Sequence, residues 1–448
     1  MPLEAPAFAS ALCEASGCWV SLLLGLHPAN IEGLRGVMRD LTHDGNSIVL
    51  VDHDTQILKE ADWLIEMGPG AGEHGGRVIA QGTIADVMKN PASRIAPFLS
   101  DTHNLAVRQR AEGAHMFDLG TIALKTSAIH TVHPLDVRLP KGRLIAVTGV
   151  SGSGKTTLIL ESLIPALEAG LRGEKLPAHV QSIDAPGIAA VKLIDATPIG
   201  INVRSTVATY ANVHDELRKL YARTPDAKRL NRKAGDFSYN TGALRCPTCD
   251  GTGIISLDIQ FLPDVDIPCP DCGGTRYCKD ASLIRRIAKS GASHTLPELM
   301  AMSVDEALNA CGDLPTVSSR LKTLSSLGLG YLTLGEATPN LSGGEAQRLK
   351  LASEMGRGQS DAIFVFDEPT IGLHPLDVMT LLGVFQRLIE QGATVIVIEH
   401  DLDVIRNADY IVDMGPGGGE DGGRIVACGT REEIAANPES VTGGYLIS

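Results

Sequence analysis

Basic residues are the scarce class in this sequence: 39 Lys and Arg stand against 53 Asp and Glu, for a formal net charge of −14. An acidic total argues against a generally basic nucleic-acid binder, so contact with DNA needs a local basic surface. Long apolar runs are missing too, because no stretch approaches the ~20 residues of a membrane span. The first ten residues, MPLEAPAFAS, lack the basic start of a signal peptide. We therefore predict a cytoplasmic protein with no membrane partner.

What the sequence does contain is length, apolar residues and cysteine. Its 448 residues are 44% apolar, which is enough for two to four domains with their own cores. Nine cysteines are present. In a reducing compartment they indicate metal ligands or free thiols rather than disulfides.

A long internal repeat organises the chain. Leu26 aligns with Leu373, and the offset of 347 holds without a gap to Pro91 and Pro438. Two copies at so long an offset indicate a duplicated domain rather than a solenoid. The copies differ just before a shared GLHP, where FDEPTIGLHP in the second answers WVSLLLGLHP in the first. Residues 1–25 stand in place of the first copy's catalytic strand and match nothing, so we expect an acidic pair in the second copy alone.

A phosphate-binding motif precedes the second copy. The apolar strand predicted at 144–148 runs into GVSGSGKTT and an apolar-periodic helix, which is the strand–loop–helix context of a P-loop. Glycines let backbone N–H groups converge on phosphate, while Lys155 reaches the β- and γ-phosphates and Thr156 ligates Mg²⁺. A flexible Gly/Ser loop is the alternative. The predicted nucleotide-binding residues of this loop are Gly149, Ser151, Gly152, Ser153, Gly154, Lys155, Thr156 and Thr157.

Two carboxylates end the buried strand predicted in DAIFVFDEPT. We expect Asp367 to hold Mg²⁺ and Glu368 to polarise the attacking water. His400 ends a further apolar strand, VIVIEHD, which suits a contact to the γ-phosphate. The alternatives are a surface acidic pair and a structural histidine.

A second phosphate receptor lies in PNLSGGEAQRLKLASEM, where Ser342, Gly343 and Gly344 precede a predicted helix. LSGGE followed by Gln and Arg resembles the signature of the ABC ATPase superfamily. In that superfamily two domains sandwich ATP head to tail, and the signature of one closes over the P-loop of the other. An ordinary glycine-initiated helix is the alternative.

A metal-binding pattern lies between the P-loop and the signature. Cys246, Cys249, Cys269 and Cys272 follow C-x₂-C-x₁₉-C-x₂-C, which places four thiolates for tetrahedral Zn²⁺. The alternating segment ISLDIQF between the pairs predicts a strand of a β-ribbon. An iron–sulfur site is the alternative, and Cys278 is read as a spare thiol.

Together these motifs resemble the UvrA family, which supplies the damage-sensing ATPase of the bacterial UvrABC excinuclease in nucleotide excision repair. The resemblance rests on GVSGSGKTTL, on QFLPDV inside the cysteine-rich segment, on LGLGYLTLGEATPNLSGGEAQRLKLASE and on FDEPTIGLHPLDV. It covers 112–448 in full, while 26–105 match the end of the family's first ATPase domain.

The resemblance implies an α/β fold with a P-loop ABC-type ATPase domain. That domain carries a zinc-ribbon-bearing insertion and follows the C-terminal remnant of a first ABC domain. The expected parts are an unmatched segment 1–25, the remnant 26–110, the second ATPase domain 111–200 and 330–448, and an insertion 201–329 with the zinc ribbon and a DNA-binding surface.

The resemblance also implies ATP, Mg²⁺ and Zn²⁺ as cofactors, ATP hydrolysis, and double-stranded DNA as a partner. The chain departs from the family at Ala196, where the family has a glutamine that reads Mg²⁺ and nucleotide state. The family's first P-loop, its first signature and the region with which it binds UvrB find no match in this sequence. We therefore expect a homodimer or a separate protein that supplies the first ATPase half, rather than a complex with UvrB of the same excinuclease. A non-hydrolysing DNA-binding remnant and a soluble ABC ATPase of drug resistance remain as alternatives.

Basic residues gather locally around 218–233 and after the zinc ribbon. Such clusters can neutralise backbone phosphates without reading bases, which suits a sensor of helix distortion. A solvated helix face is the alternative. The predicted DNA-binding residues are Arg218, Lys219, Arg229, Arg232, Lys233 and Arg276.

Overall fold

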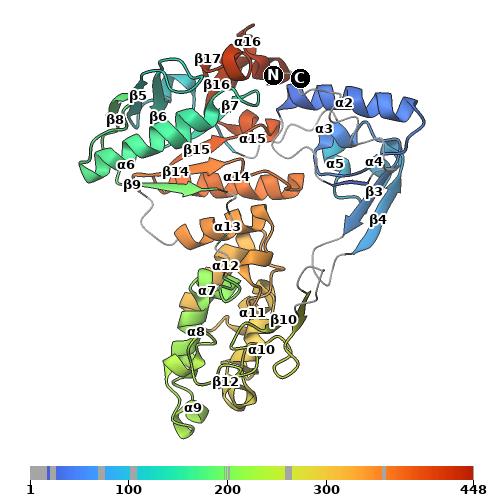
Figure 1. Cartoon of the computed structure of the whole chain (residues 1–448), viewed down its shortest axis with the longest axis vertical. Helices are drawn as coiled ribbons and strands as arrows, with labels where there is room; N and C mark the ends of the chain where they lie inside the picture. The colour runs from blue at the N-terminus through green and yellow to red at the C-terminus, as the bar shows by residue number, and fades with distance from the viewer. Residues whose placement is uncertain are drawn as a thin grey trace. The chain divides into compact units, whose positions relative to one another are not determined.

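The computed structural model describes residues 18–20, 27–68, 76–100, 108–195, 197, 199, 202–257, 265–355 and 360–446 (Figure 1). The chain forms two compact units, unit 1 from Met1–Ala196 with Gly358–Ser448 and unit 2 from Thr197–Arg357. Unit 2 therefore takes in the whole predicted insertion, 201–329, together with the signature. Among the described residues, no helix is both long and apolar enough to cross a bilayer.

A six-stranded sheet is the centre of unit 1. Five of its strands run parallel to one another, and only the edge strand β17 is antiparallel to its neighbour. This arrangement confirms the predicted α/β fold class. The buried runs of Val and Ile in these strands are typical of a sheet covered on both faces. In order across the sheet the strands are β17 (Arg424–Gly429), β16 (Tyr410–Gly415), β7 (Leu144–Gly149), β15 (Thr394–Ile398), β14 (Ala362–Asp367) and β9 (Ala190–Ile194).

Helices and a smaller sheet cover the two faces of this sheet. The π-helix η3 (Thr157–Leu163) continues into α6 (Ile164–Arg172) on one face, and α14 (Pro375–Glu390) lies on the other (Figure 1). The antiparallel sheet of β6 (Asp136–Pro140), β5 (Thr121–Thr126) and β8 (Val180–Asp184) shares one apolar core with β7, β15 and α6. Short elements complete this part of unit 1: η2 (Gly113–His115), α15 (Leu402–Asn407), η7 (Gly419–Asp421), α16 (Arg431–Ala436) and α17 (Val441–Leu446).

The first copy of the repeat folds like the second. Helix α2 (Pro28–His43) has the bounds of α14 less the offset of 347. Strand β1 (Cys18–Val20) pairs in parallel with β2 (Val49–Val51) in the same register in which β14 pairs with β15. Backbone strand geometry is therefore present inside segment 1–25, although its sequence matched nothing. The other first-copy elements are α3 (Thr55–Leu58), β3 (Leu64–Gly68), β4 (Arg77–Gly82), α4 (Ile84–Lys89) and α5 (Ala96–Leu99).

Unit 2 is mainly helical and carries two β-hairpins. Its core is aromatic, since Tyr221, Phe237, Tyr239 and Tyr277 are almost wholly buried. The hairpins pair β10 (Ile254–Leu257) with β11 (Val265–Pro268) and β12 (Arg285–Ile287) with β13 (Ser293–Thr295). The helices are α7 (Val207–Tyr210), α8 (Val213–Tyr221), α9 (Pro225–Arg229), η4 (Ala234–Phe237), η5 (Lys279–Leu283), α10 (Leu296–Ala301), α11 (Val304–Ala310), α12 (Pro315–Ser326), η6 (Thr338–Asn340) and α13 (Gly343–Glu354).

Candidate nucleotide site and metal centre

The P-loop leaves the carboxyl end of β7, where the neighbouring parallel strands also end. Gly149 closes the strand with φ of 132°, and a Cβ there would lie 2.0 Å from the carbonyl oxygen of Met414. Only glycine fits so close an approach of two backbones. The loop then turns directly into η3, so that its N–H groups converge at a helix N-terminus as a phosphate receptor requires.

A second glycine-rich segment, 415–423, packs against the P-loop backbone and donates hydrogen bonds to it. The N–H of Gly419 donates to the carbonyl of Gly152 at 3.1 Å, and the N–H of Gly423 donates to the carbonyl of Ser153 at 3.1 Å. A Cβ on Gly418 would lie 2.4 Å from the carbonyl oxygen of Ser151. These contacts hold the P-loop backbone in its shape.

Lys155 is buried and folded back onto its own loop. Its Nζ donates to the carbonyls of Gly149 at 2.8 Å and Val150 at 3.0 Å. Burial lowers the pKa of Lys155 to about 8, while the carboxylates of Glu368 and Asp413 pull the pKa upward. A lysine held by neutral carbonyls keeps its charge available for an incoming anion.

The acidic pair and His400 come together at the same edge of the sheet. Asp367 ends β14, and burial raises the pKa of its carboxyl with Glu368 adding to the effect. Glu368 has φ of 46°, in the left-handed region that few non-glycine residues adopt. Its Oε1 lies 3.6 Å from Nε2 of His400. Burial lowers the pKa of His400, so this side chain is kept neutral beside the carboxylate.

His27, from the first copy, also reaches this site, and sequence reasoning missed it. The Ala29 N–H donates to Nδ1 of His27 at 3.2 Å, which leaves the proton of the neutral ring on Nε2. Nε2 lies 3.1 Å from Oγ1 of Thr442, and the Thr442 hydroxyl donates to Asp413 at 2.8 Å. Asp413 is one of the carboxylates that act on Lys155. A hydrogen-bonded chain therefore runs from the first copy to Asp413, whose charge acts on the P-loop lysine.

A signal for His27 was present in the sequence. It is the histidine of the repeated GLHP, and its counterpart in the second copy is His374. Burial lowers the pKa of His27 to about 3, and the nearby His400 and Lys155 act in the same direction. A fully buried, neutral histidine fits the Nε2 donor role given above.

The signature residues lie in unit 2 at the start of α13. Ser342 caps the helix, because its Oγ accepts from the N–H of Glu345 at 3.3 Å and the Glu345 carboxylate accepts from the N–H of Ser342 at 2.7 Å. Gly343 and Gly344 form the first turn, and as glycines they have no side chains that would cover its N–H groups. The capping box fixes the helix start and presents a bare N-terminus.

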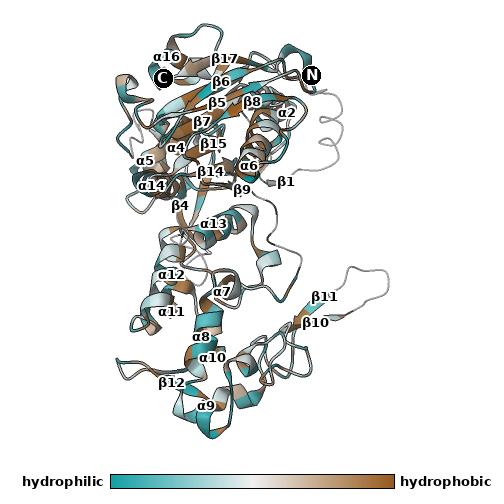
Figure 2. Cartoon of the chain, turned by 90° about the vertical axis from the view of Figure 1, so that its left-hand side faces the viewer, coloured by the Kyte–Doolittle hydropathy of each residue, from teal (hydrophilic) through white to brown (hydrophobic). Residues whose placement is uncertain are grey.

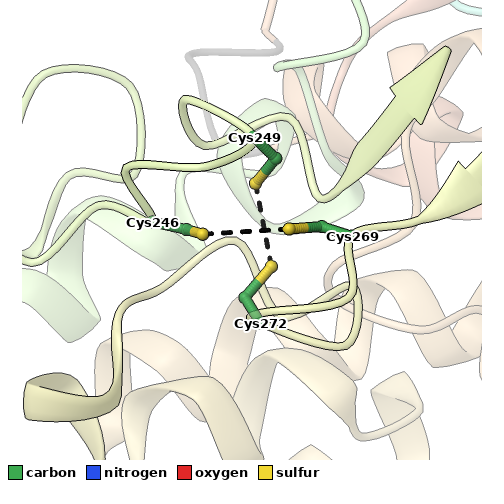
Figure 3. Close-up of side chains that lie close together, drawn as sticks. All are labelled: Cys246, Cys249, Cys269 and Cys272. Atoms are coloured by element: carbon green, nitrogen blue, oxygen red, sulfur yellow. Dashed lines mark hydrogen bonds between the residues drawn. The ribbon is translucent and has the colours of Figure 1, made fainter.

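The four predicted cysteines form one cluster in unit 2 (Figure 3). All four Sγ atoms lie within 4.8 Å of one another. The Sγ atoms of Cys246 and Cys269 are 3.9 Å apart, and those of Cys249 and Cys272 are 3.7 Å apart. Zn–S bonds of about 2.3 Å in a tetrahedron require sulfur atoms about 3.8 Å apart. The donor set therefore fits a tetrahedral metal ion, and it is the one such group among the described residues.

Backbone N–H groups prepare this cluster for a charged thiolate. The N–H of Gly253 donates to Sγ of Cys249 at 3.3 Å. Burial opposes ionisation, but hydrogen bonds from the N–H of Gly253, the thiol of Cys246 and the N–H of Gly251 outweigh it and bring the pKa of Cys249 down to about 7. The hairpin β10–β11 leaves the cluster, as the ribbon prediction expected; residues 258–264, which include most of QFLPDV, lie outside the described part.

Arg276 has a different place from the one the charge pattern suggested. Only 7% of it is exposed, and its guanidinium donates to the carbonyl of Val203 at 2.9 Å. The same group lies 5.4 Å from the ring centroid of Tyr239. Because the protein itself engages this side chain, Arg276 joins the cysteine cluster to the aromatic core, and we leave it out of the proposed DNA surface.

The other basic residues lie on or near α8 and α9, which Figure 2 shows in hydrophilic teal. Several are paired with acids three residues before them: Lys219 with Glu216 at 3.1 Å and Arg229 with Asp226 at 3.0 Å. Arg218 pairs with Asp215 in the same way at 2.5 Å. Arg232 lies 3.9 Å from Asp280, and Lys233 is exposed. Sequence reasoning counted these charges but did not count the acids beside them.

No family model matches the chain, but individual relatives do. It is 41% identical over 427 residues to UvrABC system protein A of Thermus thermophilus, covering 94% of this chain and 44% of that protein. It is 43% identical over 429 residues to the same protein of Streptococcus pyogenes serotype M6, again covering 94% and 44%.

A solved structure gives the same result. The crystal structure of UvrA2 from Deinococcus radiodurans superposes with a TM-score of 0.87 at 39% identity, over 96% of this chain and 51% of that one. The chain thus spans about half the length of the relatives it matches. Ala196, the predicted departure in the nucleotide site, lies outside the described residues. In sequence and in fold, this chain belongs to the UvrA family.

Proposed function

We propose that the chain is a UvrA-like, zinc-containing, DNA-binding ATPase of nucleotide excision repair that acts in the cytoplasm. The observation that carries this proposal is the meeting of Lys155, Asp367, Glu368 and His400 at one edge of the sheet, in a chain of UvrA ancestry.

Each residue has a task in ATP hydrolysis. The N–H groups of the P-loop and Lys155 bind the β- and γ-phosphates, while the Thr156 hydroxyl and Asp367 hold Mg²⁺, which supplies charge neutralisation on the phosphates. Glu368 accepts hydrogen bonds from the attacking water, and the neutral His400 contacts the γ-phosphate through Nε2. Ser342 and Gly344 close over nucleotide bound to another domain, as in head-to-tail ABC pairs.

Zinc and DNA belong to unit 2. Four thiolates at tetrahedral spacing hold Zn²⁺, which staples a module too small to have a large core of its own. The basic residues of α8 and α9 contact phosphates of the duplex and read its shape rather than its bases. The ion pairs with Asp215, Glu216 and Asp226 keep these side chains oriented until phosphate replaces the carboxylates.

Of the two partner arrangements expected from the sequence, we favour a separate polypeptide over a homodimer. The surface next to His400 and Thr442 is already covered by His27 of the same chain, whose side chain is fully buried. A second chain that paired through its own second ABC domain would have to displace this contact.

Phosphate release by the chain purified together with the polypeptide that associates with it, with and without duplex DNA carrying a bulky lesion, tests the proposal. We expect Glu368→Gln to bind ATP but to lose at least ~100-fold in turnover, since it keeps the shape of the side chain and removes the base. Glu390→Gln, an exposed carboxylate on α14 that hydrogen-bonds to Gln386, is the matched control and should change nothing.

DNA affinity measured across salt tests the second half of the proposal. We expect the slope of log K against log salt to fall by about 2–3 when Arg229, Arg232 and Lys233 are replaced by alanine together. Arg172→Ala, an exposed arginine on α6, is the control. Affinity that does not respond to salt would leave the basic residues as a solvated face and refute DNA binding by this surface.

One observation supports a second candidate, a nucleotide-gated DNA binder without turnover. The first copy has Val20 where the second has Asp367, and Ser21 where it has Glu368. In an ABC pair that uses both copies of the repeat, the nucleotide site of the first copy therefore lacks the two carboxylates that hydrolysis requires. ATP binding with no phosphate release under any DNA condition, in the presence of the associated polypeptide, would favour this candidate.

A further inference from the structure

Arg276 brings a buried positive charge into contact with three separate segments of backbone. Only 7% of the residue is exposed. Its guanidinium donates to the carbonyl of Val203 at 2.9 Å and to those of Gly251 and Gly335 at 3.4 Å each. A buried charge is costly unless hydrogen bonds satisfy it. Because these acceptors are main-chain atoms, the side chain fixes where three stretches of backbone lie relative to one another.

One of the three segments belongs to the metal centre, as Arg276 itself does. We call residues 245–253 and 269–276, which carry the four cysteines, the knuckle. The N–H of Cys246 donates to the carbonyl of Arg276 at 3.0 Å, so the backbone of Arg276 is tied to the first pair of cysteines. Its φ of 73° lies in the left-handed region, which a non-glycine residue keeps only where its surroundings hold it there. The guanidinium therefore starts from a rigid base.

Two segments, 203–208 and 334–338, contain the other two carbonyls and pair with each other. The N–H of Thr338 donates to the carbonyl of Ser205 at 2.9 Å. Two more backbone hydrogen bonds join Val207 to Glu336 at 3.0 Å and Ala208 to Leu334 at 2.9 Å. We call these two stretches the paired segments. Arg276 connects both of them to the knuckle.

A second arginine makes a contact in the opposite direction. Arg204, on the first of the paired segments, donates to the carboxylate of Asp250 in the knuckle at 2.7 Å. The Asp250 side chain is 54% exposed, so solvent screens this ion pair and weakens it. The buried contacts of Arg276 are therefore the main link between the knuckle and the paired segments.

The paired segments lead directly to the signature. Thr338 is 1% exposed, and its hydroxyl donates to the carbonyl of Ile199 at 2.9 Å. It begins η6, and the N–H of Leu341 donates to its carbonyl at 3.3 Å. Ser342, the cap of α13, is the next residue. Because hydrogen bonds continue from one end of this stretch to the other, a displacement of Gly335 would move the signature turn with it.

We propose that Arg276 is a positioning residue for the signature: it holds Val203 and Gly335 against the metal-held knuckle and so fixes the turn Ser342–Gly344. The first paired segment continues into α7 and α8, where the proposed DNA surface begins. DNA on α8 and phosphate on the signature turn then share one support. The inference deepens the proposed function and rests on it for these two ligands; the link from the knuckle to the signature needs neither of them.

Backbone hydrogen exchange in the free, zinc-loaded chain tests this link. The side chain of Arg276→Gln is too short to reach Val203 or Gly335, so the amides of 334–346 should exchange at least about tenfold faster while one zinc per chain is retained. Arg276→Lys keeps the charge on a single ammonium group, and its exchange should be only about threefold faster than in the unmodified chain. The amides of α14, in the other unit, should not change in either variant.

Arg245→Gln is the matched control. Arg245 lies in the same knuckle, but among the described residues its guanidinium donates to the carbonyl of Asn240 at 3.1 Å and to Asp250 at 2.8 Å rather than to the paired segments. Exchange in 334–346 should therefore stay at the rate of the unmodified chain. Equal acceleration in this variant would show that any loss in the knuckle loosens unit 2, and would overturn a specific role of Arg276.

Duplex DNA supplies a readout that a purely structural role would not move. In the unmodified chain, saturating DNA should slow exchange in 339–346 by about threefold, and this change should vanish in Arg276→Gln although its DNA affinity stays within about twofold. A change that persists in the variant, or that is missing from the unmodified chain bound to DNA, would refute the shared support. If DNA does not bind the unmodified chain, the proposed function fails, while the comparison of free chains still tests the link.

Two results in the free chain overturn the inference. Unchanged exchange in 334–346 of zinc-loaded Arg276→Gln would show that the signature does not depend on this side chain. Loss of zinc from that variant would make Arg276 a support of the cysteine cluster itself. If Arg276→Gln does not fold, Arg276→Lys decides: exchange about threefold faster than in the unmodified chain supports the link, and an unchanged rate refutes it.

Discussion

The imidazole rings of His27 and His400 lie edge to face, with their centroids 5.7 Å apart and their planes at 86°. The related pair, His53 and His374, has centroids 6.2 Å apart at 72°. The offset of 347 carries each histidine of one pair onto a histidine of the other. The two copies of the repeat therefore meet across an approximate two-fold axis, and each sends its GLHP histidine to the partner copy's EHD or DHD segment.

Removal of the His27 side chain should slow hydrolysis without weakening nucleotide binding. His27→Ala breaks the chain from Ala29 through Thr442 to Asp413, which acts on Lys155, whereas the P-loop contacts to phosphate are local. We expect turnover to fall about tenfold, a loss of about 1.4 kcal/mol in transition-state stabilisation, with ATP affinity changed less than twofold.

His53→Ala is the matched control for this variant. It removes the histidine equivalent to His400 from the first copy, where no acidic pair follows β1. Equal losses of turnover in both variants would show that the ring contacts only hold the two copies together, and would contradict a specific role of His27.

The pH dependence of stability should reveal a buried carboxyl at the junction of the copies. Burial raises the pKa of Asp54 to about 6, and Asp401, its counterpart in the second copy, adds to the effect. A carboxyl whose pKa is higher in the folded state stabilises below its unfolded value near 4 and loses that contribution as the pH rises through 6. Asp54→Asn should therefore raise the free energy of unfolding at pH 8 by about 1–2 kcal/mol and leave it unchanged near pH 4.

The substitution keeps the helix cap, because an asparagine oxygen also accepts the N–H of Gln56 that Asp54 now binds at 2.8 Å. Asp86→Asn is the contrasting control: hydrogen bonds from Thr83 hold the pKa of Asp86 below its usual value, so this variant should lose stability at pH 8. Urea titrations at the two pH values measure both. A stability of Asp54→Asn that parallels the unmodified chain at every pH would contradict a perturbed carboxyl at position 54.

Local motifs made most of the site predictable from sequence. Within the P-loop, the signature and each C-x₂-C pair, the interacting groups are only a few residues apart in the sequence. Their spacing alone therefore indicates which atoms converge. His27 and Arg276 could not be predicted in this way. The partner of His27 at Thr442 is 415 residues away, and the carbonyl that Arg276 binds at Val203 is 73 residues away. Such contacts depend on how whole elements pack.

The fold class was equally readable, but β1 was not. The six-stranded sheet follows from apolar runs that alternate with helices and a P-loop. Strand β1 pairs with β2 through backbone groups, which residues 18–20 supply whatever their side chains are. Sequence comparison with the second copy detects side chains only, so it found nothing at this position.

Loss of two cluster thiols should remove the metal. We expect one Zn²⁺ per purified chain, and none in Cys249→Ala with Cys272→Ala, because two remaining thiolates cannot close a tetrahedral site. Cys278→Ala, which removes a cysteine outside the cluster, should retain the full amount. Elemental analysis with a thiol count gives both numbers. Iron in place of zinc, or full metal content in the double variant, would contradict the assignment.

Mixing two inactive variants should fail to restore turnover. Lys155→Ala loses the P-loop contact, and Ser342→Arg blocks the signature, so a head-to-tail pair of second ABC domains would contain one intact composite site. Random pairing would then give roughly a quarter of the unmodified rate. We expect no such recovery, because His27 already covers the surface beside His400 that this pairing requires.

Addition of the separate polypeptide favoured above should instead raise turnover of the unmodified chain and of Ser342→Arg, but not of Lys155→Ala. The site that contains Lys155 and Glu368 takes its signature from that polypeptide, whereas the site closed by Ser342 has Val20 and Ser21 in place of the acidic pair. Rates measured at several protein concentrations separate the two arrangements, since self-pairing makes turnover rise faster than linearly. Recovery on mixing, with such a steep concentration dependence, would establish the homodimer and contradict the separate partner.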